Sequence, residues 1–182
     1  MSAAERLFAA ILLDEDCRTA AAQAIDGLRA GAAAGSFTPR ENLHLTLVFL
    51  GETDRADAAR RALRSVEGAP FPLTFGAAGR FRRDGGDIWW LGVEPCAPLL
   101  AIQRRLAQAF RGEGFELERR AYRPHLTLGR RVALRPGFGA GEWSAGLPKL
   151  RCPVRALSLM RSERTAGGMR YTEIERQQLS RG

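Results

Sequence analysis

The sequence lacks any long hydrophobic run. None of its apolar stretches approaches the roughly 20 residues that a membrane-spanning helix requires, so a helical membrane protein is excluded and no membrane partner is expected. The best N-terminal candidate for a signal peptide, Leu7–Leu13, stops at Asp14, and no small-residue cleavage site follows it. We therefore expect a cytoplasmic protein.

Cysteine is scarce. The three cysteines, Cys17, Cys96 and Cys152, lie far apart, their count is odd, and no Cys-x-x-Cys pair exists. Neither a disulfide framework nor a zinc cluster is therefore indicated. No histidine stands near a cysteine in the sequence, which gives no support to a cysteine nucleophile.

Lysine is nearly absent. Lys149 is the one lysine among 28 Lys and Arg residues, which exceed the 20 Asp and Glu residues and produce a formal net charge of +8. Codon bias in a GC-rich genome explains arginine in place of lysine, but it does not explain the excess of cations over anions. A basic surface favours anionic partners, of which nucleic acid is the commonest.

Hydrophobic patterning predicts interleaved strands and helices, without a low-complexity linker. We expect strands over 6–13, 43–50, 71–81, 88–93, 123–130, 154–160 and 169–174, helices over 14–30, 55–66 and 98–111, and loops over 32–39 and 135–148. A hairpin around residues 84–87 and two paired C-terminal strands break a strict βαβ rhythm. The pattern favours one α+β domain over 1–182, with mixed or antiparallel sheets.

Histidine is also rare, and its placement is the strongest signal in the sequence. Both histidines begin a His-Leu-Thr-Leu tetrapeptide, at His44 and again at His125, 81 residues later. From average residue frequencies, a given histidine is followed by Leu-Thr-Leu about once in two thousand cases. The duplication is therefore hard to attribute to accident, and it indicates an internal repeat.

Each tetrapeptide lies on an expected strand, within 43–50 or 124–130. Because successive side chains of a strand alternate between its faces, the His and Thr of each motif project together while the two leucines enter a core. Two such strands facing each other would bring two imidazoles and two hydroxyls into one site. The candidate set is His44, Thr46, His125 and Thr127.

These side chains suit displacement at phosphorus. A histidine pair with unperturbed pKa values of about 6.5 provides a base for the attacking oxygen and an acid for the leaving oxygen. Threonine hydroxyls donate hydrogen bonds to the equatorial oxygens. No metal ion is required when the leaving group is strained, as in the five-membered ring of a ribose 2′,3′-cyclic phosphate.

Two other interpretations of the histidines compete with this one. A histidine on a strand is more often packed than catalytic, but the duplication reverses that expectation. A metal site is the second competitor, and two histidines without a nearby cysteine or acidic cluster provide too few ligands. Asp84 and Asp87 fit a turn instead, so we expect no metal.

The stretches around the two tetrapeptides resemble a known family. They are Arg6–Ile11, Glu41–Glu52, Trp90–Val93, Tyr122–Arg130 and Arg170–Tyr171. The duplicated His-x-Thr-x motif is the signature of the 2H phosphoesterase superfamily. The surrounding stretches, which run from end to end of the chain, narrow the resemblance to the RNA 2′,3′-cyclic phosphodiesterases, also called 2′-5′ RNA ligases.

The resemblance implies a bilobal α+β fold with pseudo-twofold symmetry. Two antiparallel sheets flanked by helices would enclose a central basic cleft, with one motif from each lobe, 43–50 and 124–130. The implied reaction opens 2′,3′-cyclic phosphate ends of RNA to 2′-phosphomonoesters. Some members also join tRNA halves reversibly through a 2′-5′ bond without ATP. No metal or nucleotide cofactor is expected, and we expect a monomer whose partner is RNA, with tRNA fragments as one candidate.

The roles of the motif residues follow as hypotheses. His125 acts as base on the attacking water and His44 as acid on the departing 3′ oxygen, although the symmetry leaves the reverse open. Thr46 and Thr127 hold the phosphoryl oxygens. Arg130, five residues after His125, is expected to bind phosphate, but only a bend in the strand after Gly129 would turn it to the histidine face.

The sequence says less about which residues contact the nucleobase. Aromatic residues near the motif strands are candidates for stacking on a nucleobase, although most aromatic residues belong to the core. The candidates are Phe8, Phe37, Tyr122 and Tyr171.

Three other functions stay open. A non-catalytic RNA-binding protein would keep the cleft, although both histidines and both threonines are intact. A 2H phosphodiesterase acting on a small cyclic nucleotide is the second, and the basic charge favours a polynucleotide over it. An unrelated fold with a fortuitous repeat is the third.

Overall fold

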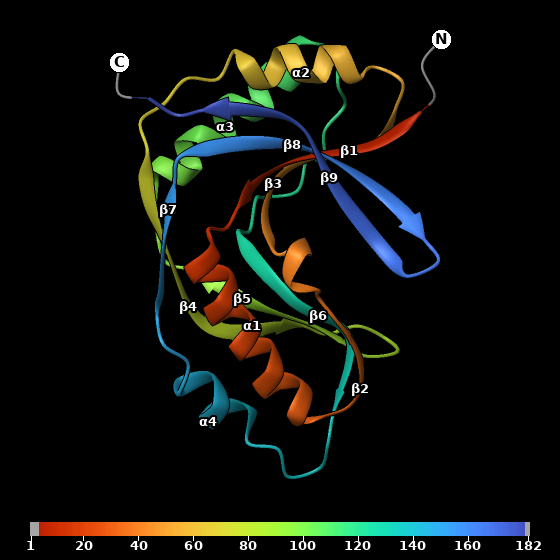
Figure 1. Cartoon of the computed structure of the whole chain (residues 1–182), viewed down its shortest axis with the longest axis vertical. Coiled ribbons are helices and arrows are strands. Elements are labelled where there is room, and N and C mark those ends of the chain that lie inside the picture. Colours follow the sequence, from red (N-terminus) through yellow and green to blue (C-terminus); the bar gives the residue numbers. More distant parts are fainter. Residues whose placement is uncertain (1–3, 181–182) are drawn as a thin grey trace.

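The computed structural model describes residues 4–180 (Figure 1). Within this range the strands are β1 (Glu5–Leu12), β2 (Ala32–Phe37), β3 (His44–Thr53), β4 (Phe71–Phe81), β5 (Asp87–Val93), β6 (His125–Leu134), β7 (Leu150–Val154), β8 (Ala156–Thr165) and β9 (Gly168–Gln178). The helices are α1 (Glu15–Ala30), α2 (Ala56–Arg64), α3 (Ala97–Gly112) and α4 (Ala140–Ala145), with a 3-10 turn η1 (Arg40–Asn42). No helix in this range is long and apolar enough to cross a bilayer.

The strands form an antiparallel sheet in the order β7-β4-β5-β6-β3-β1-β8-β9, with β2 paired to β6. This is the α+β architecture that the sequence predicts. The two expected sheets are joined where β3 meets β6, and the register there pairs Leu45 with Leu126. We call β3, β1, β8 and β9 the first half of the sheet, and β6, β5, β4, β7 and β2 the second half.

Helices cover the two halves separately. α2 and α3 pack on each other and on the first half, whereas α1 packs on the second half through β2, β6 and β7 (Figure 1). α3 buries Leu99, Ile102, Leu106 and Phe110, the face that helical spacing predicts. Asp14 is the N-cap of α1, and its side chain accepts a hydrogen bond from the main-chain N–H of Cys17.

Three segments differ from the sequence prediction. Residues 32–39, expected as a loop, contain β2, because pairing with β6 overrides the weak strand propensity of an Ala-Gly-Ser stretch. The expected loop over 135–148 contains the short helix α4. The strand expected over 154–160 is split, since Val154 ends β7 and β8 begins at Ala156. β7 tolerates Pro153 because it lies at the edge of the sheet.

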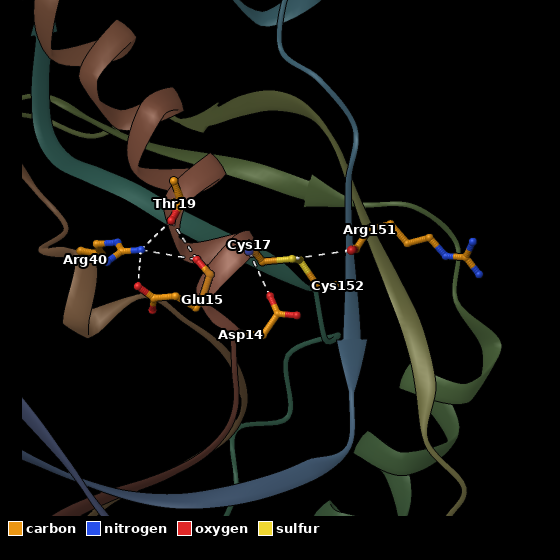
Figure 2. Close-up of a disulfide and its surroundings, with 7 residues drawn as sticks. All are labelled: Asp14, Glu15, Cys17, Thr19, Arg40, Arg151 and Cys152. Atoms are coloured by element: carbon orange, nitrogen blue, oxygen red, sulfur yellow. Dashed lines mark hydrogen bonds and ion pairs between the residues drawn. A yellow bond between two sulfur atoms is a disulfide. The ribbon is translucent and has the colours of Figure 1, made fainter.

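The cysteine prediction was wrong for two of the three residues. Cys17, in the first turn of α1, forms a disulfide with Cys152 of β7, and their Cα atoms are 5.9 Å apart (Figure 2). The two residues are separated by 135 positions, so spacing in the sequence carried no information about their contact. Packing of α1 across β7 creates the geometry that a disulfide requires.

Candidate active site

The two motif strands have the same local structure. β3 begins at His44 and β6 at His125, and in both the histidine and threonine are partly exposed while the two leucines are buried. This confirms the predicted alternation of faces. Counting from the antiparallel Leu45–Leu126 pair, each histidine lies opposite the threonine of the other motif. The four predicted motif side chains therefore share one face where the two halves of the sheet meet.

Both imidazoles are held by the same contact. Nδ1 of His44 lies 2.7 Å from the carbonyl oxygen of Asn42, and Nδ1 of His125 lies 2.7 Å from that of Arg123, in each case two residues earlier. A carbonyl oxygen only accepts, so Nδ1 carries the proton in both rings. Nε2 of each neutral ring is then an acceptor, the state that a general base requires.

His44 is enclosed by aromatic rings. The ring centroids of Phe8 and Tyr171 lie 4.9 Å and 5.1 Å from that of His44. Its Nε2 is 3.1 Å from Oγ1 of Thr46, which donates to the neutral ring. The buried side chain of Asn42 donates from Nδ2 to the carbonyl of Met169, 2.7 Å away, and so fixes the residue whose own carbonyl orients His44.

His125 also has two aromatic neighbours, contributed by β4 and β5. The ring centroids of Phe81 and Trp90 lie 5.3 Å and 6.3 Å from that of His125. Trp90 packs over Gly79, where an added Cβ would come within 2.2 Å of the indole. Trp89, on the opposite face of β5, is buried in the core, as alternation along the strand predicts.

Burial lowers the pKa of both histidines. Loss of solvent is the largest cause for each, and the hydrogen bond to the main-chain carbonyl opposes it. The positive charge of Arg130 lowers the pKa of both rings further, and Arg120 acts on His125. Both rings are therefore neutral near pH 7 before an anion binds.

A cavity of about 650 Å³ opens beside these residues. Thr46 and His125 line it, together with segments of α3 and of residues 117–123. Its wall is basic, since five arginines face it against one acidic residue, Glu118. The five are Arg83, Arg111, Arg120, Arg123 and Arg130.

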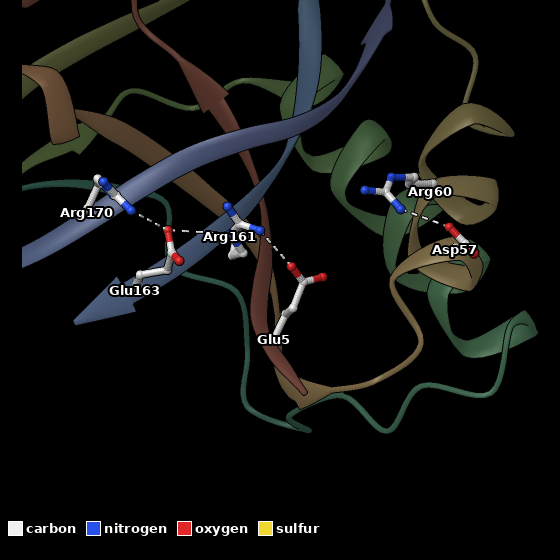
Figure 3. A network of polar contacts seen from close by, with 6 residues as sticks. All are labelled: Glu5, Asp57, Arg60, Arg161, Glu163 and Arg170. Carbon is white, nitrogen blue, oxygen red and sulfur yellow. Dashed lines mark hydrogen bonds and ion pairs between the residues drawn. The ribbon is translucent and has the colours of Figure 1, made fainter. Parts of the chain in front are cut away.

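Several arginines outside the cavity form ion pairs with acidic side chains. Arg161 lies between Glu5, at 2.9 Å, and Glu163, at 3.6 Å, and Arg170 lies 3.2 Å from Glu163 (Figure 3). Among the five cavity arginines, Arg120 is the one with an acidic partner within residues 4–180. The remaining four leave positive charge available to an anion in the cavity.

Arg130 reaches the cavity because β6 is distorted. Trp89 of β5 pairs with Gly129 but Trp90 pairs with Thr127, which leaves Leu128 as an extra residue in β6. Such a bulge shifts the later side chains to the other face. The bend that a phosphate-binding role for Arg130 requires is therefore present, although it begins one residue before Gly129.

Hydroxyl groups also link the two motifs. The Tyr122 hydroxyl, three residues before His125, donates to the carbonyl of Thr46, and Oγ1 of Thr38 donates to the carbonyl of Thr127, both at 2.9 Å. Each segment that leads into one motif thus holds the other motif. We call this pair of contacts the cross-brace. Burial raises the pKa of Tyr122, so its hydroxyl stays a neutral donor.

Of the four residues predicted to contact a nucleobase, three lie near a motif histidine or the cavity and one lies apart from them. Phe8 and Tyr171 surround His44, and the Tyr122 side chain lines the cavity. Phe37 lies apart from the cavity wall, where it packs against the core under the guanidinium of Arg29.

Sequence reasoning did not select Phe81 and Trp90, which lie beside His125. Both come from the hairpin of β4 and β5, and nothing in their spacing relates them to His125. Within residues 4–180, no group of three or more His, Cys, Asp or Glu side chains is arranged to hold a metal ion.

Comparison with known proteins gives consistent matches. A family model described as the 2'-5' RNA ligase superfamily matches residues 17–166. A protein of Methanothermobacter thermautotrophicus named RNA 2',3'-cyclic phosphodiesterase is 34% identical over 180 residues, covering 93% of this chain and 96% of the relative. A protein of the same name from Escherichia coli is 32% identical over 188 residues, covering 97% of both chains.

Solved structures show the same fold. Escherichia coli LigT in its apo form superposes with a TM-score of 0.77 at 29% identity, covering 99% of this chain and 100% of that one. TT0787 of Thermus thermophilus gives a TM-score of 0.74 at 28% identity, with 95% and 97% covered. The predicted fold is confirmed by these similarities.

Proposed function

Because this chain belongs to the 2'-5' RNA ligase superfamily, we propose that it is an RNA 2′,3′-cyclic phosphodiesterase that uses its two histidines as acid and base. The two relatives of this name described above match 93% and 97% of the chain. The observation that supports the mechanism most directly is the matched pair of Nδ1–carbonyl contacts at 2.7 Å, which occupies Nδ1 of each ring and leaves Nε2 as the atom that exchanges a proton.

The reaction is an in-line displacement at the ring phosphorus. Nε2 of His125, which lines the cavity, takes a proton from water as the water oxygen bonds to phosphorus. The bond from phosphorus to O3′ breaks, and His44 donates a proton to O3′. The product is a 2′-phosphomonoester with a 3′-hydroxyl. This assignment gives the base role to the histidine that solvent in the cavity reaches.

The threonines and Arg130 stabilise the negative charge that develops on the equatorial oxygens. Thr46 is held by Nε2 of His44 at rest and exchanges that acceptor for a phosphoryl oxygen. Arg130 offsets the substrate charge from the cavity wall. The bound anion in turn raises the pKa of the nearby imidazoles, which lets His44 hold the proton it must donate.

Ligation follows from the same geometry. A 5′-hydroxyl in place of water, deprotonated by the same base, produces a 2′-5′ phosphodiester from the cyclic phosphate. The strained ring supplies the driving force, so ATP is not needed. We propose this as a second activity, and tRNA fragments as substrates for both, in a monomeric cytoplasmic protein whose two sheet halves act as its two lobes.

A small cyclic nucleotide is the alternative substrate. The four cavity arginines without acidic partners favour a longer anion, because a single cyclic phosphate carries one negative charge. Affinity for a polynucleotide should fall steeply with salt, whereas affinity for a cyclic mononucleotide should change little.

The first experiment incubates the purified protein, in EDTA, with a short RNA that ends in a 2′,3′-cyclic phosphate. His44→Ala and His125→Ala are tested alongside it. Ring opening to a 2′-phosphate that both substitutions abolish supports metal-free catalysis by two histidines. An intact ring with measurable RNA binding contradicts the proposal and supports a binding protein.

A further inference from the structure

Asn42, two residues before His44, is the one asparagine in the sequence, and it is buried. Its main-chain N–H donates to the carbonyl of Pro39 at 2.9 Å, and its side-chain Nδ2 donates to the carbonyl of Met169 at 2.7 Å. Its own carbonyl oxygen accepts the Nδ1–H of His44, also at 2.7 Å. The carbonyl that holds His44 therefore belongs to a residue that is fixed through both its main chain and its side chain.

The second motif is held in a different way. Arg123 stands two residues before His125, and its carbonyl accepts the Nδ1–H of that ring. Arg123 lies in a segment without helix or strand, residues 115–124, and its side chain lines the cavity. The same main-chain contact is thus tied to the protein fold in the first motif and to the wall of the cavity in the second.

Strand β9 provides the anchor for Asn42, although β1 and β8 separate it from β3 in the sheet. The carbonyl of Met169 accepts the hydrogen bond from Asn42, and two residues later the ring of Tyr171 lies 5.1 Å from that of His44. One strand therefore contacts both the imidazole and the residue that holds its Nδ1.

The hairpin of β8 and β9 is fixed in turn by ion pairs. Arg161 of β8 lies 2.9 Å from Glu5 of β1, and Glu163 of β8 lies 3.2 Å from Arg170 of β9, its partner in the register (Figure 3). Arg170 and Tyr171 are neighbours in a strand, so the ion pairs and the contact with His44 lie on opposite faces. The position of the Met169 carbonyl is thus set by three strands.

We infer that Asn42 is a positioning residue for His44, through which the hairpin of β8 and β9 holds the proton on Nδ1 and aims Nε2 into the site. This inference rests on the proposed function, in which His44 transfers a proton through Nε2. In a neutral imidazole, the hydrogen bond made by one nitrogen decides which nitrogen carries the proton. A carbonyl that is free to move would let the ring rotate or change its tautomer.

The test uses Asn42→Leu, which removes the Nδ2 donor but keeps a branched side chain and the charge of the protein. Asn42→Ala is the second variant, which fits even if leucine is not accommodated. Ser158→Ala is the matched control, because Ser158 is the other buried polar residue within 4–180 and donates one hydrogen bond, to Glu173 at 2.6 Å. This control loses a buried hydrogen bond without touching a motif residue.

The first readout is the ¹⁵N NMR titration of the imidazole rings. The chain has two histidines, so His125→Gln identifies the signals of His44. In Asn42→Leu we expect His44 to populate the Nε2–H tautomer and its pKa to fall further, because the Asn42 carbonyl raises that pKa in the parent. The other charged or titratable groups around His44 are Arg130, His125 and Tyr171, and none of them is altered. The signals of His125 should stay in place.

The second readout is the kinetics of opening a 2′,3′-cyclic phosphate at an RNA end. We expect Asn42→Leu to lower kcat by about 10- to 100-fold, the cost of a misplaced catalytic group, with KM close to that of the parent. In the pH–rate profile, the limb that His44→Gln removes should move, and the other limb should not. Ser158→Ala should retain the parent kcat, both limbs and both sets of ring signals.

A His44 tautomer and pKa that match the parent in both Asn42 variants overturn the inference, even where the variants are less stable. An equal loss of kcat in Ser158→Ala also overturns it, and so does the parent kcat in a variant whose ring signals have changed. These results leave the proposed function intact. If the parent protein opens no cyclic phosphate, the proposed function fails, and the ring signals still decide whether Asn42 holds His44.

Discussion

The two halves of the site share a tetrapeptide, a histidine–carbonyl contact and a bulge that leaves Leu47 of β3 and Leu128 of β6 as extra residues, but they differ in how deeply the histidine is buried. His44 is the more deeply buried, under Phe8 and Tyr171, and its Nε2 already has the Thr46 hydroxyl as a partner. His125 lines the cavity, and no partner for its Nε2 is found within residues 4–180. In the mechanism that we propose, the shared features supply the acid–base chemistry, and the difference in burial is the basis for assigning His125 as the base and His44 as the acid.

The strongest test of this comparison is to remove each histidine separately. His44→Gln and His125→Gln should each lower kcat/KM by about 100- to 10,000-fold, the usual contribution of a general acid or base. The pH–rate profiles should differ. Loss of the base removes the acidic limb, which lies below 6.5 because the pKa of His125 is lowered, and loss of the acid removes the alkaline limb.

The parent profile is the control for both variants. If the same limb disappears from His44→Gln and His125→Gln, the two rings do not have separate roles. If the limbs are exchanged, the roles are separate but reversed, and His44 is the base.

The threonines should show a smaller effect. Thr46→Val and Thr127→Val should each reduce kcat by about 10- to 1000-fold, because each removes one donor to the developing negative charge. Thr→Ser at the same positions keeps the donor and should retain most of the activity. Unchanged rates in both valine variants would contradict a role in phosphate binding.

The two valine variants should also differ from each other. Thr46→Val removes the hydroxyl that contacts Nε2 of His44, whereas no such contact links Thr127 to His125 within residues 4–180. Thr46→Val should therefore shift the limb of the pH profile that belongs to His44. Thr127→Val should leave both limbs in place.

Much of this site could be predicted from the sequence, because its information is local. The alternation of His and Thr against two leucines defines a face, and the structure confirms it at both motifs. Arg130 could be placed on the histidine face only by assuming a bend in the strand, and the bulge in β6 supplies that bend.

The features that the sequence did not predict depend on contacts between segments that are far apart in the chain, and residue spacing does not reveal such contacts. Cys17 meets Cys152 because α1 crosses β7, and β2 is a strand only because β6 pairs with it. Phe81 approaches His125 through a hairpin of the neighbouring strands. In each case tertiary packing brings together segments whose own sequence patterns do not predict the contact.

The cross-brace should contribute less to catalysis than the motif residues do. Thr38→Val and Tyr122→Phe each remove one hydroxyl from a main-chain carbonyl, which should lower the free energy of unfolding by about 1 kcal/mol. Because the brace sets the spacing of the motifs, kcat should fall several-fold with KM nearly unchanged. Thr38→Ser, which keeps the hydroxyl, should restore kcat. A Thr38→Val variant with the parent kcat would limit the brace to a structural role.

The smallest expected effect is on the pH dependence of the free energy of unfolding. It tests whether His44 is more deeply buried than His125. The pKa of each histidine is lower in the folded protein than its ordinary value of 6.5, so the folded state favours the neutral ring. The neutral histidine therefore makes its full contribution to the free energy of unfolding above pH 6.5. This contribution is lost as the pH falls from 6.5 through the folded-state pKa, because the unfolded chain then binds the proton more readily. The slope cannot exceed about 1.4 kcal/mol per pH unit for one proton.

Urea unfolding between pH 5 and pH 7 measures this slope above the usual carboxylate range. His44→Gln should flatten it more than His125→Gln, because burial is the main cause of the lowered pKa and His44 lies deeper. Thr19→Val, on the exposed face of α1, is a control without a titrating group. Equal flattening in the two histidine variants would mean that both rings lose the same amount of solvent on folding, and it would remove depth as the basis for assigning the acid and the base.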